Sequence, residues 1–360
     1  MPIRVAIIGL GAVTRNIHLP AYSKLRDKVS VVAGCDIDSD AKTFVKRKWH
    51  LPELYDNPQE MIEKTKPDIV CICTPPALHY EQCLMGLDYG CHVFCEKPLV
   101  ESLSQADEII QASNRAKRFV VVNSEFPCMN IHTSAKKLIG SPEFGRLLFL
   151  HASQTFHPTE FTEAGWRGKM QRRISLDFAV HVFELIKFFF EDHPTKIFCH
   201  MPNPKPETNY EVVNISSLEF ADGRAASSVL DRLSKGPESY LDMRLDGEFA
   251  SIHTSIGGEA RFEIGMHTRE KRPFVEFSFV KGGKAVLQNG NRSKIIAKDG
   301  VNPFASATAV HFRNFIEAIQ NGGEPRATAG DNRNTLALAF AAYDSAQTGR
   351  IVEMGQYFKN

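Results

Sequence analysis

Two short groups of residues in this sequence have side chains that could do chemistry. The first is Glu96-Lys97-Pro98, which follows the apolar segment Cys91–Cys95. Proline cannot continue a sheet ladder and favours an extended residue before it, so the segment is predicted to be a strand that ends here. A lysine beside a carboxylate at the carboxyl end of a strand lies where open α/β sheets bind ligands. The alternative is a surface turn with an incidental ion pair.

The second group is Asp177 and His181, within the apolar segment Leu176–Phe189. This segment is predicted to be helical, and a spacing of four residues places both side chains on one helix face. Burying two polar side chains in an apolar helix costs free energy, which favours a functional pair over two hydrogen-bonded core residues. Histidine ionises near neutral pH, so His181 is the candidate acid or base.

A glycine loop near the amino terminus predicts a dinucleotide site. The apolar segment Ile3–Ile8 is predicted to be a strand, and Ile17–Leu25 a helix. Glycines between a strand and a helix permit a tight turn and let backbone N–H groups approach a pyrophosphate. The loop residues expected to bind the cofactor are Gly9, Leu10, Gly11, Ala12 and Val13.

The coenzyme preference depends on the end of the second predicted strand, Val29–Cys35, which is followed by Asp36. A carboxylate in this position binds ribose hydroxyls and repels a 2′-phosphate. Ile37 supplies no cation to receive such a phosphate. The sequence therefore favours NAD over NADP, and Arg15 is the residue that could reverse this preference.

The elements that must position these groups follow two patterns. Up to about residue 125, five strands alternate with helices, which predicts an α/β domain with a doubly wound parallel sheet of the Rossmann type. Turn signals such as Asp222-Gly223 and Asn289-Gly290 then predict an α+β domain with an open, mainly antiparallel sheet. We expect an NAD-binding domain at 1–125 and a substrate and oligomerisation domain at 126–360, with the helices of 305–348 packing at the domain interface.

Composition excludes several classes of partner. A chain of 360 residues is long enough for two cores, and its 43% hydrophobic and 24% charged content is typical of a soluble globular protein. A net charge of +1 gives no reason to expect nucleic acid as a partner. No targeting segment or membrane span is apparent, so a cytoplasmic location is expected.

The eight cysteines lie mostly within predicted strands and helices and are expected to be reduced, buried and small hydrophobic residues. A zinc site is conceivable, but the spacing follows strand alternation rather than that of a zinc knuckle. No metal is therefore expected. The four residues of the conceivable zinc site are Cys71, Cys73, Cys91 and Cys95.

Several motifs together give the chain a resemblance to a known family. They run from Gly9 nearly to the carboxyl terminus: Gly9-Leu10-Gly11 with His18-Leu19-Pro20-Ala21, Thr74-Pro75 with His79, Glu96-Lys97-Pro98, Trp166-Arg167, Asp177-x₃-His181, Phe315-x₂-Ala318-Ile319 and Tyr343-x-Ser345-Ala346. The chain resembles the glucose–fructose oxidoreductase/inositol dehydrogenase family of NAD(P)-dependent sugar oxidoreductases. This resemblance implies a Rossmann domain, an open sheet whose outer face is often buried in a dimer or tetramer, and a Lys97–Pro98 bond that is often cis.

The resemblance also implies hydride transfer between nicotinamide and a carbinol carbon of a sugar, cyclitol or sugar derivative. His181 would take or return the hydroxyl proton, Lys97 would stabilise the alkoxide and relay the proton, and Asp177 would hold a substrate hydroxyl. Further cofactor contacts are expected from Thr74, Pro75, His79, Glu96 and Lys97. Substrate contacts are expected from Asn123, Trp166, Arg167, Arg173, Asp177 and His181.

The chain departs from the family near the expected substrate. Gln171-Arg172-Arg173 stands where a glycine run is common, Ala179 replaces a usual glycine, and Glu125-Phe126 stands where arginine–phenylalanine is frequent. Arg167, Lys169, Arg172 and Arg173 favour an anionic substrate, such as a sugar phosphate, uronate or nucleotide sugar, although a solvated charged surface is the alternative. Two other functions stay open: a redox-neutral NAD-dependent enzyme that cleaves glycosides, and a sugar or NAD sensor without catalysis.

Overall fold

The computed structural model describes residues 2–155, 166–205, 207–208, 210–235, 239–257, 259–267, 272–280 and 283–358, with only the backbone described at 239, 259–267 and 272–280. Most of the predicted loop 157–173 therefore lies outside the described residues. The chain divides into two compact units: the first is Met1–Cys128, Phe304–Phe340 and Gln356–Asn360, and the second is Met129–Pro303 and Ala341–Gly355. The predicted division had all residues after 125 in one domain, and the roles assigned to the two domains stay predictions. Among the described helices, none is both long and apolar enough to cross a membrane.

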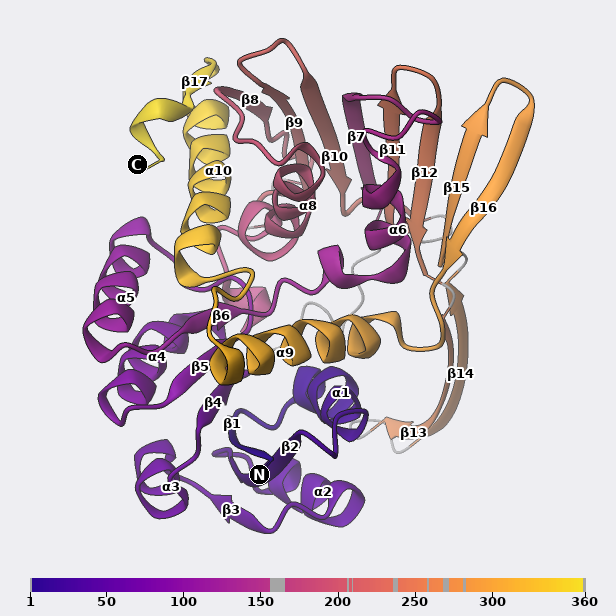
Figure 1. Ribbon diagram of the computed structural model, residues 1–360. Helices are drawn as coiled ribbons and strands as arrows, with labels where there is room; N and C mark the ends of the chain where they lie inside the picture. Colours follow the sequence, from indigo (N-terminus) through magenta and orange to yellow (C-terminus); the bar gives the residue numbers. More distant parts are fainter. Residues whose placement is uncertain are drawn as a thin grey trace. The chain divides into compact units, whose positions relative to one another are not determined.

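The first unit is built on a six-stranded sheet in the order β3-β2-β1-β4-β5-β6 (Figure 1). All five strand pairs are parallel, and this order is that of a Rossmann fold, so the predicted doubly wound sheet is confirmed. The three-residue strand β3 was not predicted, because it is too short and too exposed to show a pattern. The strands are β1 (Ile3–Ile8), β2 (Val29–Cys35), β3 (Glu53–Tyr55), β4 (Ile69–Ile72), β5 (His92–Cys95) and β6 (Val120–Val122).

Capping residues fix where the helices of the first unit begin. The side chains of Asp38, Asn57 and Ser102 each accept a hydrogen bond from a backbone N–H of the first turn. The helical elements are a π-helical stretch (Thr14–His18), α1 (Leu19–Ser23), α2 (Ser39–Trp49), α3 (Pro58–Thr65), a 3₁₀ turn (Pro76–Leu78), α4 (His79–Asp88), α5 (Leu103–Ala116), a 3₁₀ turn (Phe126–Cys128), α9 (Pro303–Asn321) and the first part of α10 (Ala329–Thr348).

A helix from late in the sequence completes the core of the first unit. Phe312, Phe315 and Ile316 of α9 lie in one hydrophobic cluster with Val5 and Phe94 of the sheet. The rings of Phe94 and Phe312 meet edge to face, with centroids 4.9 Å apart. A parallel sheet must be covered on both faces, and α9 supplies part of that cover.

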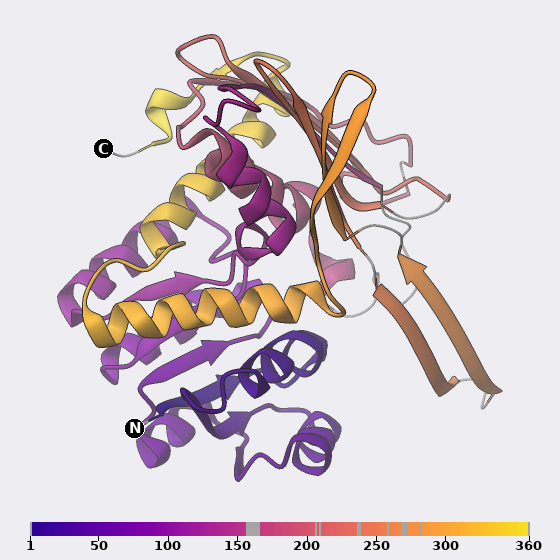
Figure 2. The ribbon, with the colours of Figure 1, turned by 45° about the vertical axis from the view of Figure 1, so that its right-hand side comes forward.

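The second unit contains a nine-stranded sheet in the order β16-β15-β12-β11-β7-β10-β9-β8-β17 (Figure 2). Its described pairs are antiparallel except for β7 with β10, so the prediction of a mainly antiparallel sheet is confirmed. A separate antiparallel pair is formed by β13 and β14. The strands are β7 (Leu147–Thr155), β8 (Lys196–His200), β9 (Val213–Glu219), β10 (Ala225–Asp231), β11 (Ser239–Gly247), β12 (Ser251–Ile256), β13 (Glu259–His267), β14 (Arg272–Val280), β15 (Lys284–Asn289), β16 (Arg292–Lys298) and β17 (Val352–Glu353).

Helices of the second unit pack on one face of this sheet. The helix α8 contacts β7, and α6 contacts β12, β15 and β16. The opposite face carries exposed Phe198, Ile215 and Ile295. The helical elements are α6 (Asn130–Leu138), a 3₁₀ turn (Arg167–Lys169), a π-helical stretch (Ile174–Ala179), α8 (Val180–Phe190), the last part of α10, and a 3₁₀ turn (Met354–Gln356).

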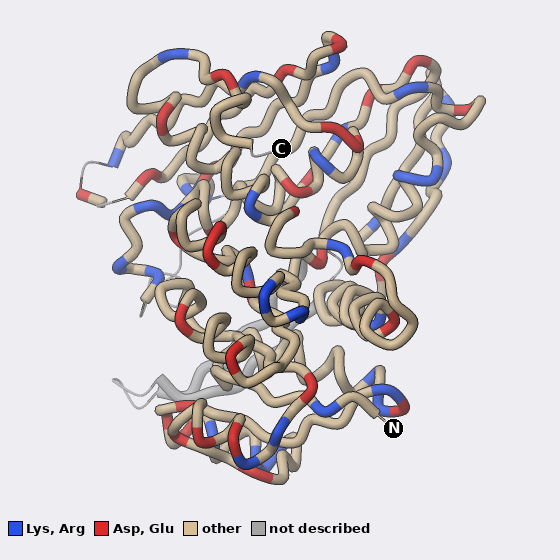
Figure 3. Tube along the Cα trace, turned by 60° about the vertical axis from the view of Figure 1, so that its left-hand side comes forward, with Lys and Arg blue, Asp and Glu red and all other residues tan. Residues whose placement is uncertain are grey.

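Acidic and basic residues are interspersed along both units. Figure 3 shows Lys and Arg positions interspersed with Asp and Glu positions through the described chain. The 43 Lys and Arg residues nearly balance the 42 Asp and Glu residues, which gives the net charge of +1.

Candidate functional site

The predicted cofactor residues of the first unit follow the carboxyl ends of its parallel strands. Because all these strands run in one direction, the residues after them lie along the same edge of the sheet. The residues in question are Gly9 after β1, Asp36 after β2, Thr74 after β4, and Glu96 and Lys97 after β5, and the expected substrate residue Asn123 follows β6. This edge is where a doubly wound sheet binds its ligand.

The glycine loop after β1 combines one crowded position with one open position. Gly9 has φ +90°, and a Cβ there would lie 2.7 Å from the carbonyl oxygen of Cys73. At Gly11 a Cβ would meet no atom within 4 Å. The hydroxyl of Thr14, which replaces the third glycine, donates to the Gly9 carbonyl over 2.5 Å. The loop is thus held by its own residues while the space at Gly11 fits the close approach of a pyrophosphate.

Asp36 is tied to the glycine loop. One carboxylate oxygen accepts from the Leu10 backbone N–H over 2.7 Å, and the other accepts from the Asp38 N–H over 2.9 Å. The side chain of Ile37 is 92% exposed. The guanidinium of Arg15 lies over the ring of Phe44, with its central carbon 5.0 Å from the ring centroid. The carboxylate is therefore placed beside the loop, and Arg15 already has an aromatic partner.

Glu96 is the centre of a buried hydrogen-bond network. Its Oε1 lies 2.6 Å from His18 Nε2 and accepts from the Asn123 amide over 2.8 Å. Burial opposes ionisation of Glu96, but the bond to His18 lowers the pKa of Glu96 to about 2. Asn123, predicted to bind substrate, also contacts Thr308 of α9 over 3.3 Å. These contacts fix the residue that precedes Lys97.

The loops after β4 and β5 are held together by His79. Its Nδ1 lies 2.9 Å from the Pro98 carbonyl oxygen, and its Nε2 lies 2.8 Å from the Thr74 carbonyl oxygen. Burial lowers the pKa of His79, and the hydrogen bonds to the two carbonyl oxygens oppose this shift. The Lys97–Pro98 bond is cis, as the resemblance led us to expect. His79 thus positions the loops that carry Thr74, Pro75 and Lys97.

Two residues of this network were not among the predicted site residues. His18 appeared only within the motif His18-Leu19-Pro20-Ala21, and Glu125 only as a departure from the family. Glu125 is buried, and burial together with the charge of Glu96 raises its pKa to about 8. The motif could have identified His18, whereas no sequence pattern places Glu125 beside Glu96.

In the second unit, Asp177 lies in the π-helical stretch and His181 in the first turn of α8. Both are buried. Arg167 Nε lies 3.5 Å from Asp177 Oδ2, and the Arg167 guanidinium lies over the Trp166 ring at 4.4 Å. Three predicted substrate residues, Trp166, Arg167 and Asp177, are thus brought together. The sequence predicted a plain α-helix here, but a π turn precedes α8, a feature frequent at functional sites.

The basic residues before Asp177 do not form one cluster. Arg172 is exposed and lies over the Tyr343 ring at 5.3 Å, whereas Arg173 is fully buried over the Tyr210 ring at 4.7 Å. The carboxylate of Glu211 accepts from the backbone N–H of Arg173 over 2.9 Å and from the hydroxyl of Tyr343. Arg173 is therefore part of the packing that supports the π turn.

Two family models match the chain. Residues 3–124 match the model described as an oxidoreductase family with an NAD-binding Rossmann fold, and residues 132–253 match the model of the GFO/IDH/MocA C-terminal domain. The two matched segments correspond to the parallel sheet of the first unit and to the first part of the nine-stranded sheet of the second.

Individual proteins, among them dehydrogenases and an oxidoreductase of known structure, are also similar to this chain. A D-glucoside 3-dehydrogenase of Escherichia coli is 39% identical over 114 residues, which are 32% of this chain and 32% of that protein. A D-apiose dehydrogenase of Paraburkholderia graminis is 26% identical over 366 residues, covering 97% of this chain and 89% of that protein. An oxidoreductase of Agrobacterium radiobacter, solved with NAD⁺, L-tartaric acid and magnesium, has the same fold, with a TM-score of 0.83, 19% identity and 99% of both chains covered.

The family models together span more than half of the chain and agree with the strand order of the parallel sheet. The chain therefore belongs to the Gfo/Idh/MocA oxidoreductase family and has an NAD-binding Rossmann domain.

Proposed function

We propose that this protein is an NAD-dependent dehydrogenase or reductase that acts on a carbinol carbon of a sugar, cyclitol or sugar derivative. The observation that carries the proposal is the single sheet edge that holds Gly9, Gly11, Asp36, Glu96 and Lys97. Bound NAD would supply the nicotinamide carbon that accepts or returns the hydride. The open space at Gly11 and the carboxylate of Asp36 fit its pyrophosphate and its ribose.

The chain's own residues would handle the proton and the developing charge. His181 takes the hydroxyl proton as the carbinol is oxidised and returns it in reduction. Lys97 stabilises the alkoxide with its ammonium group and relays the proton. Asp177 holds a neighbouring hydroxyl, and its ion pair with Arg167 keeps the carboxylate oriented. The proposal requires Lys97, Asp177 and His181 to act on one substrate.

The substrate we propose carries a negative group, as a sugar phosphate, uronate or nucleotide sugar does. Support comes from Arg167, at 3.5 Å from Asp177, and from the exposed Arg172. A guanidinium fork binds carboxylate or phosphate through two parallel hydrogen bonds. The buried Arg173, in contrast, has its guanidinium against Tyr210 and is better suited to support the segment than to receive the anion.

The preference for NAD over NADP is also part of the proposal. Asp36 would accept the ribose hydroxyls and repel a 2′-phosphate. Arg15, the cation that could receive such a phosphate, is stacked on Phe44. We further propose that the protein works as a dimer or tetramer.

The test is a screen of neutral sugars, cyclitols, uronates, sugar phosphates and nucleotide sugars for NADH formation by the purified protein. Turnover of an anionic member, lost in a Lys97→Ala variant, supports the proposal. Product formed without net NADH would indicate the redox-neutral cleavage of glycosides instead. Tight sugar or NAD binding without turnover across the whole panel would indicate a sensor.

A further inference from the structure

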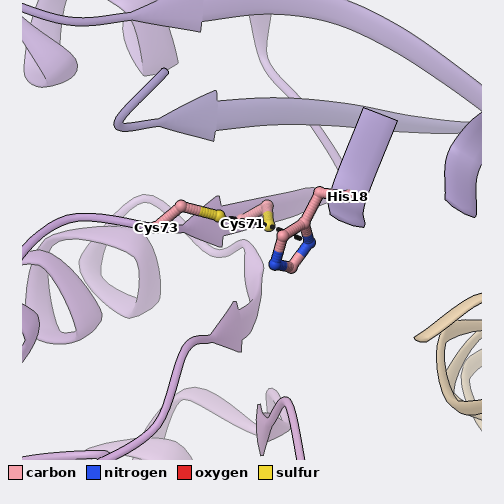
Figure 4. A group of neighbouring side chains, drawn as sticks. All are labelled: His18, Cys71 and Cys73. Atoms are coloured by element: carbon pink, nitrogen blue, oxygen red, sulfur yellow. Dashed lines mark hydrogen bonds between the residues drawn. The ribbon is translucent and has the colours of Figure 1, made fainter. Parts of the chain in front are cut away.

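Three donor side chains that the proposed reaction does not use lie together in the first unit. They are His18, at the end of the π-helical stretch, Cys71 of β4, and Cys73 just after that strand (Figure 4). Cys71 Sγ lies 3.4 Å from His18 Nδ1 and 3.5 Å from Cys73 Sγ. One ligand atom from each residue falls within 4.8 Å of the other two. An imidazole nitrogen and two sulfurs thus lie close to one another, with Cys71 Sγ between the other two.

These separations match the edges of a metal coordination polyhedron. A tetrahedral zinc ion has Zn–S bonds of about 2.3 Å and Zn–N bonds of about 2.0–2.1 Å, which puts two sulfurs about 3.8 Å apart and a sulfur about 3.5 Å from a nitrogen. The observed 3.5 Å between sulfurs and 3.4 Å between sulfur and nitrogen differ from these values by a few tenths of an ångström. The third separation, between the ligand atoms of His18 and Cys73, lies within 4.8 Å, and side-chain rotation would have to complete the set around an ion.

The neighbouring groups are those that support a metal-bound histidine and a metal-bound thiolate. Glu96 Oε1 lies 2.6 Å from His18 Nε2, the ring nitrogen that faces away from the sulfurs. Metal-ligating histidines commonly donate their second ring N–H to a carboxylate in this manner. The hydroxyl of Tyr22 donates to Cys71 Sγ over 3.1 Å, which stabilises negative charge on that sulfur, and it also lies 3.2 Å from His18 Nδ1.

Burial and donor type select the class of ion. His18 and Cys71 are fully buried, whereas Cys73 keeps partial exposure at the end of β4 and offers a route of entry. Two soft sulfurs and one imidazole favour thiophilic ions over magnesium or calcium, which prefer oxygen ligands. Alternation along one strand explains why Cys71 and Cys73 share a face, but it does not explain the imidazole and its carboxylate partner at the same point.

We propose that His18 Nδ1, Cys71 Sγ and Cys73 Sγ form a binding site for one thiophilic metal ion of the Zn²⁺ or Cu⁺ type. Glu96 holds the imidazole by its other ring nitrogen. Binding replaces the protons of the two thiols and any proton on Nδ1, and these protons leave to solvent. The four-cysteine site that the sequence made conceivable is different: Cys91 Sγ donates instead to the carbonyl of Pro67 over 3.2 Å.

The experiment is titration of the reduced full-length protein with Cd²⁺, followed by the thiolate-to-cadmium charge-transfer absorbance, with Zn²⁺ as competitor. We expect one equivalent to bind, and we expect Cys71→Ala and Cys73→Ala each to weaken binding at least about tenfold. Glu96→Gln is expected to weaken it by about 10–100-fold, the range for the carboxylate partner of a metal-bound histidine. The matched control is Cys35→Ala, at the end of β2, a strand separated from β4 by β1, which should bind like wild type.

Circular dichroism checks that each variant is folded, and the partly exposed Cys73 is the position whose loss the fold should tolerate best. If wild-type protein is saturated with Cd²⁺ and shows no thiolate-to-cadmium charge-transfer band, the proposed site is wrong. Equal Cd²⁺ affinity in wild type and the folded Cys73→Ala variant would overturn it as well. Loss of binding in Cys35→Ala to the same degree as in Cys73→Ala would point to a general effect on the fold and would also contradict the proposal.

Discussion

Loss of Lys97 or of His181 is expected to lower turnover, and loss of His181 is expected to leave NAD binding almost unchanged. Lys97→Ala and His181→Ala should each lower kcat by about two to four orders of magnitude, because each removes acid–base or electrostatic help. The dissociation constant for NAD should change little in His181→Ala, since NAD is assigned to the residues of the parallel sheet. Steady-state kinetics and calorimetric NAD titration measure the two effects. A His181 variant with near-normal kcat would mean that this histidine is a buried core residue without a catalytic role.

Asp36 is expected to set the coenzyme preference. The double change Asp36→Ser with Ile37→Arg removes the carboxylate and adds a cation at a 92% exposed position, so NADP should become the tighter ligand. Direct titration of both coenzymes against wild type and variant measures the inversion. A wild-type protein that already binds NADP more tightly would contradict the role given to Asp36.

Glu125 should make stability depend on pH. Its folded-state pKa of about 8 exceeds the ordinary 4.5, so the folded protein keeps a proton that the unfolded chain releases. The resulting stabilisation is complete below about pH 4.5 and is lost as the pH rises to about 8, by as much as about 4 kcal/mol. Glu125→Gln cannot ionise and should lack this loss. Urea unfolding at about pH 5 and about pH 8 measures the free energy of unfolding of wild type and of Glu125→Gln. If the stability of the variant relative to wild type does not increase with pH, this prediction is wrong.

Substitutions of the two glycines in the loop after β1 are expected to have different effects. Gly9→Ala would place a methyl group 2.7 Å from the Cys73 carbonyl oxygen at φ +90°, so it should lower the free energy of unfolding by more than about 1 kcal/mol. Gly11→Ala meets no atom within 4 Å and should change stability by less than about 1 kcal/mol, yet weaken NAD binding because its methyl group occupies the pyrophosphate's approach. Thermal unfolding and NAD titration separate the two. Unchanged NAD affinity in Gly11→Ala would place the cofactor elsewhere.

For the assembled molecule, the face of the nine-stranded sheet opposite α6 and α8 is expected to form the subunit contact. Phe198 and Ile215 are each 42% exposed on adjacent strands of this face, and burying them against a second copy would be favourable. Light scattering should show a dimer or tetramer for wild type and smaller species for Phe198→Glu and Ile215→Glu. Val301→Glu, at a position 83% exposed outside the sheet, is the control. A wild-type monomer at all concentrations would exclude the assembly.

Local sequence determined much of this protein. Apolar runs predicted the strands of the parallel sheet, and a hydrogen-bonding side chain predicted the helix cap at Ser102. Gly223 was predicted in a turn, and it has the positive φ angle that glycine favours. Each of these signals acts within a few residues. The motifs likewise led to the family, which the family models then confirmed. The strand β3 was not predicted, because its three residues, one exposed and two partly exposed, are too few to show a pattern.

Contacts between distant segments were decided only by the tertiary structure. The His18–Glu96 pair joins residues 78 positions apart, and α9 reaches the core of the parallel sheet from the far end of the sequence. Tyr210 and Glu211 hold Arg173 in the packing of the π turn, whereas the sequence had placed it among the residues expected to bind an anionic substrate. No periodicity encodes such contacts, since their free energy comes from shape, burial and charge that exist only once the chain is folded.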